Sequence, residues 1–322
     1  MKSTLLHRAP LRLAAVALLA AGTLFTAGTA SAALPESTVD TGPAPDAPIS
    51  GKLVPALRGE AARAATGPLV GEQFRELGEA RHAVPGAKTS SITPWTGALH
   101  VVWGSFPSVN SDGAQATHTI NPGIHLSATN PDVVYAPTLD PSGKTCIEVT
   151  TFYWQGGNGV GAWDWCAASP GFAAVSWIDT TFVNTYTSQF QGVPAYTVQD
   201  VQTNATTNSW TAYLYNYTTS SWDALFTSAD PGKLTNPGGG WDMFEVYTNY
   251  NSATGQGHYC TETYGTQFHA TNIKIKVGGT WSGLTTANSS VTPPGSVSST
   301  SFGCNGLTFS LPTANSHWQV TN

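Results

Sequence analysis

The sequence predicts an all-β domain over residues 91–322, a β-sandwich of two antiparallel, curved sheets. Runs rich in Thr, Val, Tyr and Trp recur at roughly ten- to fifteen-residue intervals, and clusters of Gly, Pro, Asn and Asp separate them. No long segment keeps the 3.6-residue apolar period of an amphipathic helix. One all-β unit of roughly 230 residues has the size of a two-sheet sandwich.

Eight runs carry the pattern of strands clearly. They are residues 98–103, 146–155, 172–178, 195–201, 209–217, 241–249, 267–277 and 306–311. Curved sandwiches of this size often have a groove on the concave face, and that is where we expect a functional site.

Composition excludes several classes of protein. Of the 322 residues, 10% are charged and 11% aromatic, and the net charge is −6. Disordered chains carry fewer aromatic residues and more charge. A nucleic-acid binder needs a basic face, which this chain lacks. After the N-terminal segment, no apolar run reaches the roughly 18 residues of a membrane span.

Residues 1–32 resemble a signal peptide. Lys2, Arg8 and Arg12 form the positive region, residues 13–21 are apolar, and residues 30–32 form an Ala-Ser-Ala cleavage site. A retained membrane anchor is disfavoured because the apolar run is short. We therefore expect a secreted protein with no membrane association after signal removal.

The four cysteines fit an oxidising compartment. An even number of Cys in an exported chain indicates disulfides. Three pairings are possible, and we favour the local one, Cys146–Cys166 with Cys260–Cys304. No C-x-x-C motif or His/Cys cluster is present. We therefore expect no metal and no cofactor.

Residues 33–90 read as a pro-segment or a linker. Their first part is rich in Pro, and residues 69–77 have a helical pattern. Residues 52–88 hold six Lys/Arg and four Glu, whereas residues 91–322 hold four Lys and twelve Asp/Glu. A mildly basic pro-segment could cover an acidic cleft and leave it at low pH, when the carboxylates become protonated. A plain spacer would have a similar composition.

The domain holds only three glutamates, Glu148, Glu245 and Glu262. Strand alternation places Glu245 on one face with Trp241, Met243, Tyr247 and Asn249, while Phe244 and Val246 face the core. Aromatic neighbours desolvate a carboxylate and raise its pKa, which suits general acid–base catalysis. The alternative, a solvated carboxylate on a sheet face, is the commoner situation.

A second run, residues 146–155, offers two partners for Glu245. Glu148 shares one face with Thr150, Phe152 and Trp154, whereas Gln155 lies on the other face. Only one of Glu148 and Gln155 can therefore face a groove if the strand is regular. No G-x-S-x-G elbow is present, and a Ser-His-Asp triad from distant residues stays open.

Several stretches resemble the glutamic peptidases. Residues 152–154 (Phe-Tyr-Trp), 163–166 (Trp-Asp-Trp-Cys) and 169–172 (Ser-Pro-Gly-Phe) are similar to the F-T-Y-W…G-C-Y-N…C-P-G-F block of neprosin-type enzymes. Residues 244–249 resemble their G-E-I-V-N strand, and residues 269–275 their F-R-N-L-Q-I strand. Residues 210–222 are similar to the E-N-L-T-T hairpin that precedes the A-E-W-I-V-E strand of the related fungal enzymes.

The resemblance covers roughly residues 95–285 and implies a sandwich with a pro-segment that acts as an acid endopeptidase. In the neprosin branch it implies cleavage next to Pro. It also implies that Glu245 is catalytic. The first catalytic Glu of that branch would fall on Thr138, which is a departure from the pattern. Glu148 and Gln155 are then the candidate partners, since the fungal branch pairs a Gln with a Glu.

In this interpretation Glu245 is the general base, and Glu148 or Gln155 donates to the oxyanion. Trp154, Trp241 and Tyr247 form the substrate walls, the substrate is a polypeptide, and the protein is a monomer. If neither partner reaches Glu245, the protein is a non-catalytic relative.

Two other functions compete. One is a carbohydrate-binding domain with an exposed aromatic platform, formed by Trp163, Trp165, Trp222 and Trp241. The other is a glycoside hydrolase with paired carboxylates, although the chain has no E-x-x-x-E or E-x-D-x-E strand.

Overall fold

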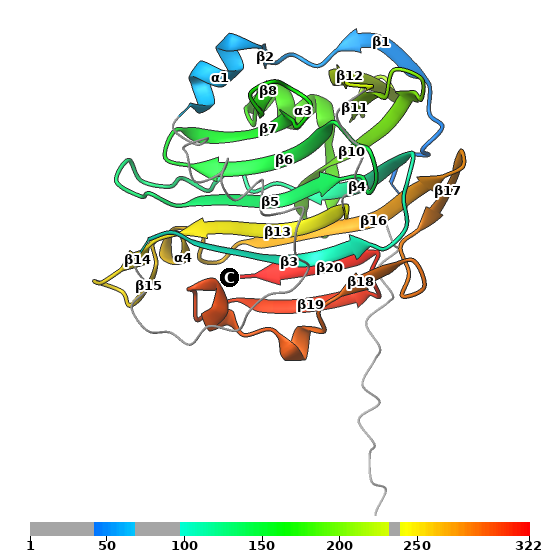
Figure 1. Cartoon of the computed structure of the whole chain (residues 1–322). Coiled ribbons are helices and arrows are strands. Elements are labelled where there is room, and N and C mark those ends of the chain that lie inside the picture. Colours follow the sequence, from blue (N-terminus) through cyan, green and yellow to red (C-terminus); the bar gives the residue numbers. More distant parts are fainter. Residues whose placement is uncertain (1–41, 68–96, 232–238) are drawn as a thin grey trace, which may run out of the picture. The chain divides into compact units, whose positions relative to one another are not determined.

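The computed structural model of the chain describes residues 42–67, 97–231 and 239–322 (Figure 1). These residues lie in one compact unit, Asp40–Asn322. Two large, mostly antiparallel sheets account for most of it, which confirms the all-β sandwich. The predicted signal peptide, the helical pattern at residues 69–77 and the domain boundary at residue 90 lie outside the described residues.

The first sheet, sheet A, has its strands in the order β1-β12-β11-β10-β4-β16-β20-β19, with β9 paired to β10 and β17 to β16. Its strands are β1 (Ile49–Leu53), β4 (Gly113–Thr119), β9 (Thr187–Phe190), β10 (Val193–Asn204), β11 (Ser209–Asn216), β12 (Ser221–Ala229), β16 (Gln267–Val277), β17 (Thr280–Gly283), β19 (Thr308–Thr313) and β20 (His317–Thr321).

The second sheet, sheet B, has the order β18-β3-β13-β5-β6-β7-β8-β2. Its strands are β2 (Leu57–Arg58), β3 (Leu99–Pro107), β5 (Val133–Asp140), β6 (Ile147–Trp154), β7 (Gly157–Asp164), β8 (Gly171–Trp177), β13 (Trp241–Thr248) and β18 (Ser289–Val291).

Short elements complete the described chain. A small hairpin pairs β14 (Tyr250–Asn251) with β15 (Gln256–Gly257). The helices are α1 (Glu60–Thr66), α3 (Thr180–Tyr186) and α4 (His258–Glu262), with 3₁₀ turns η1 (Pro294–Ser296) and η2 (Ser299–Phe302). None of the described helices has the length and hydropathy of a membrane span.

Each of the eight predicted strand regions contains a strand. Strand β7 is one of several strands outside those regions. The glycine-rich residues 156–159 are typical of a turn, whereas strand β7 begins at Gly157. Gly159 and Gly161 lie in the strand because aromatic rings lie on them: a Cβ at either position would come 2.5 Å from the ring of Phe152 or Phe172. Glycine here serves close packing, which strand propensity does not reveal.

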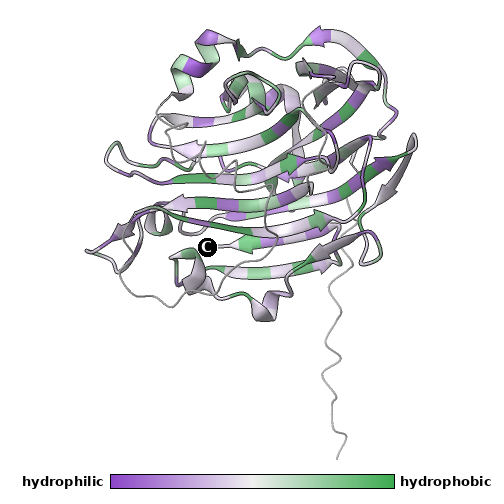
Figure 2. Cartoon of the chain, viewed as in Figure 1, coloured by the Kyte–Doolittle hydropathy of each residue, from purple (hydrophilic) through white to green (hydrophobic). Residues whose placement is uncertain are grey.

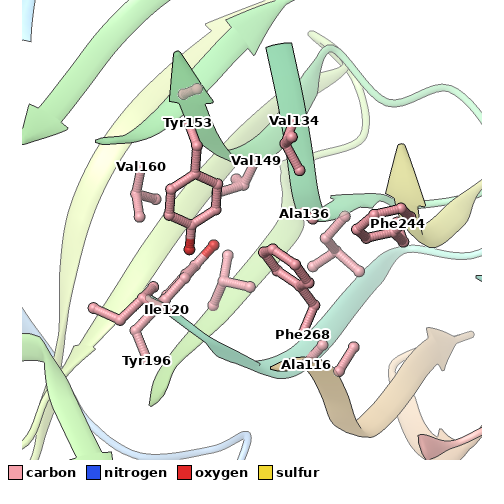
Figure 3. Close-up of a cluster of buried hydrophobic side chains, with 14 of the residues drawn as sticks. Ala116, Ile120, Val134, Ala136, Val149, Tyr153, Val160, Tyr196, Phe244 and Phe268 are labelled. Atoms are coloured by element: carbon pink, nitrogen blue, oxygen red, sulfur yellow. The ribbon is translucent and has the colours of Figure 1, made fainter. Parts of the chain in front are cut away.

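The apolar core lies between the two sheets. Hydrophobic and hydrophilic residues alternate along many strands (Figure 2), as expected when one face of each sheet is buried. Phe244 of β13, Phe268 of β16, and Tyr153 of β6 pack in this layer (Figure 3). Phe244 and Val246 face the core as predicted, which directs Glu245 to the opposite, outer face of sheet B.

A buried polar network crosses this core. His118 of β4 places its Nε2 atom 2.9 Å from Oδ2 of Asp242 in β13, and Trp318 of β20 donates its indole N–H to Oδ1 at 2.8 Å. The other ring nitrogen of His118 meets the hydroxyl of Tyr196, which also bonds Thr151 of β6. The network ties sheet A to the strand that carries Glu245.

Residues 49–58 contribute one strand to each sheet. Strand β1 pairs in parallel with β12, and β2 pairs with β8. Arg58 donates to the carbonyl oxygens of Val54 and Leu225, and α1 buries Ala62 on the outer side of sheet B. Part of the predicted pro-segment thus supplies an edge strand to each sheet.

The disulfide pairing is the local one that we favoured. Cys146 bonds Cys166 and Cys260 bonds Cys304, with Cα–Cα distances of 5.0 and 5.3 Å. The first joins the start of β6 to the segment after β7, and the second joins α4 to the segment after η2.

Replacement of Asp242 by Ala should lower the free energy of unfolding by about 3–5 kcal/mol, because it leaves His118 and the indole N–H of Trp318 buried without their acceptor. Urea unfolding followed by Trp fluorescence measures this. The control is Asp46→Ala, since Asp46 is exposed and should tolerate the change. A loss below about 1 kcal/mol, typical of surface positions, would contradict this role of the network.

A buried histidine pair predicts loss of stability in acid. His269 of β16 is fully buried, and its Nδ1 lies 3.2 Å from Nε2 of His317. Burial lowers the pKa of each ring to about 4, below its ordinary 6.5. The unfolded chain therefore binds more protons once the pH falls below about 6.5, so stability declines from there toward pH 4.

The variant His317→Gln should lose less stability than the wild type between pH 7 and pH 4.5, by about 1–2 kcal/mol, since a pKa unit is worth about 1.4 kcal/mol. Urea titrations at both pH values give the comparison, with Gln319→Asn, at a half-buried position of β20, as control. Equal acid losses in wild type and His317→Gln would show that the pair does not limit acid stability.

Candidate functional site

The outer face of sheet B is lined by aromatic side chains. A second buried cluster forms there, separate from the core between the sheets, and we call it the outer cluster. Its members are Ala62, Tyr135, Phe152, Trp154, Trp163, Phe172, Val175 and Tyr247. Glu148 and Glu245 stand on the same face, each with no exposed surface. Two carboxylates in an aromatic, water-poor setting are an uncommon arrangement, because an isolated buried charge is costly.

Glu245 lies at the centre of β13, between β3 and β5. The Nε2 atom of His100 in β3 lies 2.6 Å from its Oε1, a distance at which the ring nitrogen donates to the carboxylate. The His100 ring also stacks on Tyr247, with 4.3 Å between ring centroids and 12° between planes. The His100 side chain keeps 19% of its surface exposed, whereas that of Glu245 keeps none. His100 therefore connects a buried carboxylate to solvent.

Glu148 accepts hydrogen bonds from side chains of β5 and β13. Thr138 of β5 donates its hydroxyl to Oε1 of Glu148 at 2.5 Å, and Trp241 of β13 donates its indole N–H to the same oxygen at 3.2 Å. These bonds draw the Glu148 carboxylate from β6 across to β5. The carboxylate thus reaches the strand position at which the family resemblance called for a glutamate.

The registers show how the two glutamates relate. Glu245 pairs with Tyr135, and Tyr135 with Phe152, so Glu148 lies four residues further along β6. At about 3.3 Å per residue and 4.8 Å per strand, the two Cα atoms are about 16 Å apart. Thr138 pairs with Met243 and is thus a diagonal neighbour of Glu245, at about 7–8 Å. Because Thr138 holds Glu148, the two carboxylates flank one patch of the sheet.

The two candidate partners of Glu245, Glu148 and Gln155, lie in different surroundings. Glu148 shares the outer face with Glu245, because its strand neighbours Ile147 and Val149 belong to the core. Gln155 follows the last residue of β6 and is exposed in the turn before β7. Gln155 therefore does not share a strand face with Glu245, because β6 ends before it and the residue lies exposed in the turn.

The predicted wall residues all lie on this face. Trp154 and Tyr247 belong to the outer cluster, and Trp241 binds Glu148. The indole nitrogen of Trp154 is buried and has no hydrogen-bond partner among the described residues. Its ring lies over Gly156, where a Cβ would come 2.0 Å from a ring carbon.

The predicted exposed Trp platform does not form. Trp163 and Trp241 on sheet B and Trp222 on sheet A are each at most 5% exposed. Flat exposed rings for sugar stacking are thus absent at these three positions of the described chain. This correction removes the main observation that favoured a carbohydrate-binding domain.

Sequence reasoning missed two residues of this site, His100 and Thr138. Alternation within residues 98–103 could have placed His100 on the outer face, but its contact with Glu245 requires the β3–β13 register. The family resemblance identified Thr138 only as a departure, a threonine at the position of a catalytic glutamate. Its role in holding Glu148 depends on the pairing of β5 with β6.

Bonds on both sides of Glu245 fix strand β13. Asp242, three residues earlier, is locked in the network between the sheets. At the other end, Asp132 accepts from the Thr248 hydroxyl and from the backbone N–H groups of Asn249 and Tyr259. Burial raises the pKa of Asp132, although these three bonds oppose the rise. The hydrogen bonds of Asp242 and Thr248 therefore fix β13 on both sides of Glu245.

The described residues contain no group of three or more His, Cys, Asp or Glu side chains that could hold a metal ion. The chemistry available from the described side chains of this face is that of two carboxylates, an imidazole and hydroxyl or indole donors.

Comparison with known proteins gives distant structural neighbours only. No family model and no curated protein matches the chain. A structure of scytalido-glutamic peptidase with a peptide-based transition-state analogue has a TM-score of 0.36 and 13% identity, covering 70% of this chain and 96% of that one. A second, with a transition-state analogue inhibitor, has a TM-score of 0.37 and 11% identity, covering 72% and 99%.

A third neighbour is SCP-B, described as a member of the eqolisin family of peptidases in a complex with the tripeptide Ala-Ile-His. It has a TM-score of 0.36 and 12% identity, covering 70% of this chain and 96% of the other. At these scores the likeness assigns no role to any residue of this chain.

The variant Thr138→Val should lower the free energy of unfolding by about 1–3 kcal/mol, because it removes a donor from a buried carboxylate. Urea unfolding at pH 7 measures the loss. Thr280→Val, at an exposed position of β17, is the control. A loss no larger than that of the control would contradict this role of the Thr138 hydroxyl.

Proposed function

We propose that the chain is a secreted endopeptidase of the glutamic type, active in acid, with Glu245 and Glu148 as its catalytic pair. The observation that carries the proposal is the hydrogen bond from Thr138 to Glu148. It brings a second buried carboxylate to the strand next to Glu245, on a face lined with aromatic rings. The sequence resemblance to glutamic peptidases supports the same assignment through independent motifs.

The proposed reaction is hydrolysis of an amide by water. Glu245 takes a proton from the water, whose oxygen attacks the carbonyl carbon. Glu148, protonated in acid, donates to the developing oxyanion, and the N–H of His100 stabilises the charge on Glu245. Glu245 then gives its proton to the leaving amine as the C–N bond breaks. Water is consumed, and an acid and an amine are released.

His100 is a positioning residue in this mechanism. A 2.6 Å contact to Oε1 and the stack on Tyr247 fix one oxygen of Glu245 and orient the carboxylate. Partial exposure of the imidazole offers a path for proton exchange with solvent. Its loss should reduce turnover without removing the base itself.

Export and zymogen behaviour remain parts of the proposal. The signal-like residues 1–32 and the two disulfides support secretion. We retain residues 33–90 as a pro-segment, but removal of the whole segment would also remove two strands of the sandwich. Its described part adds β1 and β2 to the sheets, so removal would uncover the edges of β12 and β8. Proteolytic cleavage after α1 would leave β1 and β2 in place.

The proposed preference for peptide bonds next to Pro rests on the family resemblance alone.

The test is a mass-spectrometric digest of a proline-rich polypeptide at about pH 3 and pH 7. Glu245→Gln and Glu148→Gln should each lower cleavage at pH 3 by about 10²–10⁴-fold, the usual contribution of general acid–base groups. Glu262→Gln is the matched control, because Glu262 binds Ser127 and Asn130 away from this face. Cleavage that survives both active-site variants would refute the proposal, and so would hydrolysis of polysaccharide but not polypeptide.

The variant His100→Gln should reduce kcat at pH 3 by about tenfold or more and leave KM nearly unchanged, because it removes the contact that orients the Glu245 carboxylate but not the base itself. Steady-state kinetics on a single peptide substrate at pH 3 provides the readout. An unchanged kcat would show that His100 serves only to pack against Tyr247.

A further inference from the structure

A row of polar side chains lies on the outer face of sheet A, beneath the chain's own proline-rich residues 42–48. Gln115 of β4 and Gln199 of β10 are directly opposed in the strand register. Their strand neighbours Ala116 and Val198 belong to the core, so both glutamines point to the outer face. Gln115 has no exposed surface and Gln199 has 5%. Buried amides on an outer face indicate a built contact.

The two amides bind the segment as a pair. Gln199 donates from Nε2 to the carbonyl oxygen of Pro45 at 2.9 Å and to Oε1 of Gln115 at 3.0 Å. Gln115 donates from its own Nε2 to the carbonyl oxygen of Pro43 at 3.3 Å. Each amide orients the other, because both N–H groups of Gln199 are used and the acceptor of Gln115 is filled.

Proline suits this surface for a chemical reason. A prolyl residue presents a carbonyl acceptor but no N–H donor, and the glutamines offer donors in the matching places. The N–H of Ala47 bonds the carbonyl of Ala44 at 3.1 Å, which closes a turn with Pro45 at its second position. Proline is favoured there because its ring fixes the φ angle that the turn requires.

The segment also lies close to the sheet. Gly42 has a φ of +58°, and a Cβ there would stand 3.0 Å from Oγ1 of Thr117 and 3.1 Å from Nδ2 of Asn272. Residues 43, 45 and 47 are half-buried, whereas residues 44, 46 and 48 are exposed. One side of the segment therefore contacts sheet A.

We propose that Gln115, Gln199 and the adjoining outer face of sheet A form a binding site for a proline-containing turn of a polypeptide. Residues 42–48 occupy the site in cis, and a partner polypeptide of the same chemistry binds when they leave. The site lies on the other sheet from Glu245, so the inference does not rest on the proposed peptidase activity.

The test uses the full chain with its site vacated. Residues 42–48 are replaced by a Gly/Ser stretch of equal length, which keeps every strand and both disulfides. The variant also carries Glu245→Gln, so that any peptidase activity is suppressed and the result is independent of it. The probe is a fluorescent peptide with the sequence of residues 42–50, titrated to about millimolar, the effective concentration that a short tether provides. Thermal unfolding confirms that the variant is folded.

We expect saturable binding to the vacated variant, seen by fluorescence anisotropy, and none to the parent chain. Gln115→Ala or Gln199→Ala in the vacated variant should weaken binding about threefold to tenfold, the range for one hydrogen bond. Gln319→Ala, also on sheet A but bonded to Thr321, should have no effect. A peptide with its prolines replaced by Ala should bind more weakly.

Three results would overturn the inference. They are no binding up to millimolar peptide, equal binding of the proline-free peptide, and equal binding after both glutamine substitutions. Reversible dimers of the parent chain that disappear with Gln199→Ala would support the same site, with residues 42–48 of a second copy as the partner.

Discussion

The buried contact between His118 and Asp242 is the constraint on which the arrangement of the sandwich depends. Burial of a carboxylate and an imidazole is unfavourable unless each finds partners, and here Trp318, Tyr196 and Thr151 supply them. These partners come from both sheets, so they are satisfied only when the sheets take one relative position. Asp242 lies on the strand of Glu245, and the same contact therefore sets where the outer-face carboxylate stands.

Local patterning predicted much of the fold and less of the site. Alternation in residues 241–249 separated Phe244 and Val246 from Glu245 correctly, because burial of one sheet face enforces a two-residue period. Strand β7 was missed because Gly159 and Gly161 lower strand propensity, while their purpose is to admit the rings of Phe152 and Phe172. That packing involves strands β6 and β8, and a local pattern does not contain it.

The register between strands of sheet B determines the contacts of the site that the sequence did not predict. Glu148 and Gln155 were equivalent candidates until the end of β6 placed Gln155 in a turn. Thr138 stands where the resemblance expects a glutamate, and its hydroxyl holds the Glu148 carboxylate at that position. His100 comes next to Glu245 only through the pairing of β3 with β13. Each of these relations joins residues on different strands, and pairing was not determined by composition or spacing.

The central claim is that Glu245 and Glu148 act together on a peptide bond. A crystal structure of the Glu245→Gln variant, grown in acid with a bound peptide, tests it most directly. The claim predicts the scissile carbonyl over the patch between β13 and β5, with its oxygen within hydrogen-bond distance of Glu148 and its carbon facing residue 245. A peptide bound elsewhere, or a Glu148 carboxylate still sealed between Thr138 and Trp241 and away from the carbonyl, would contradict the account.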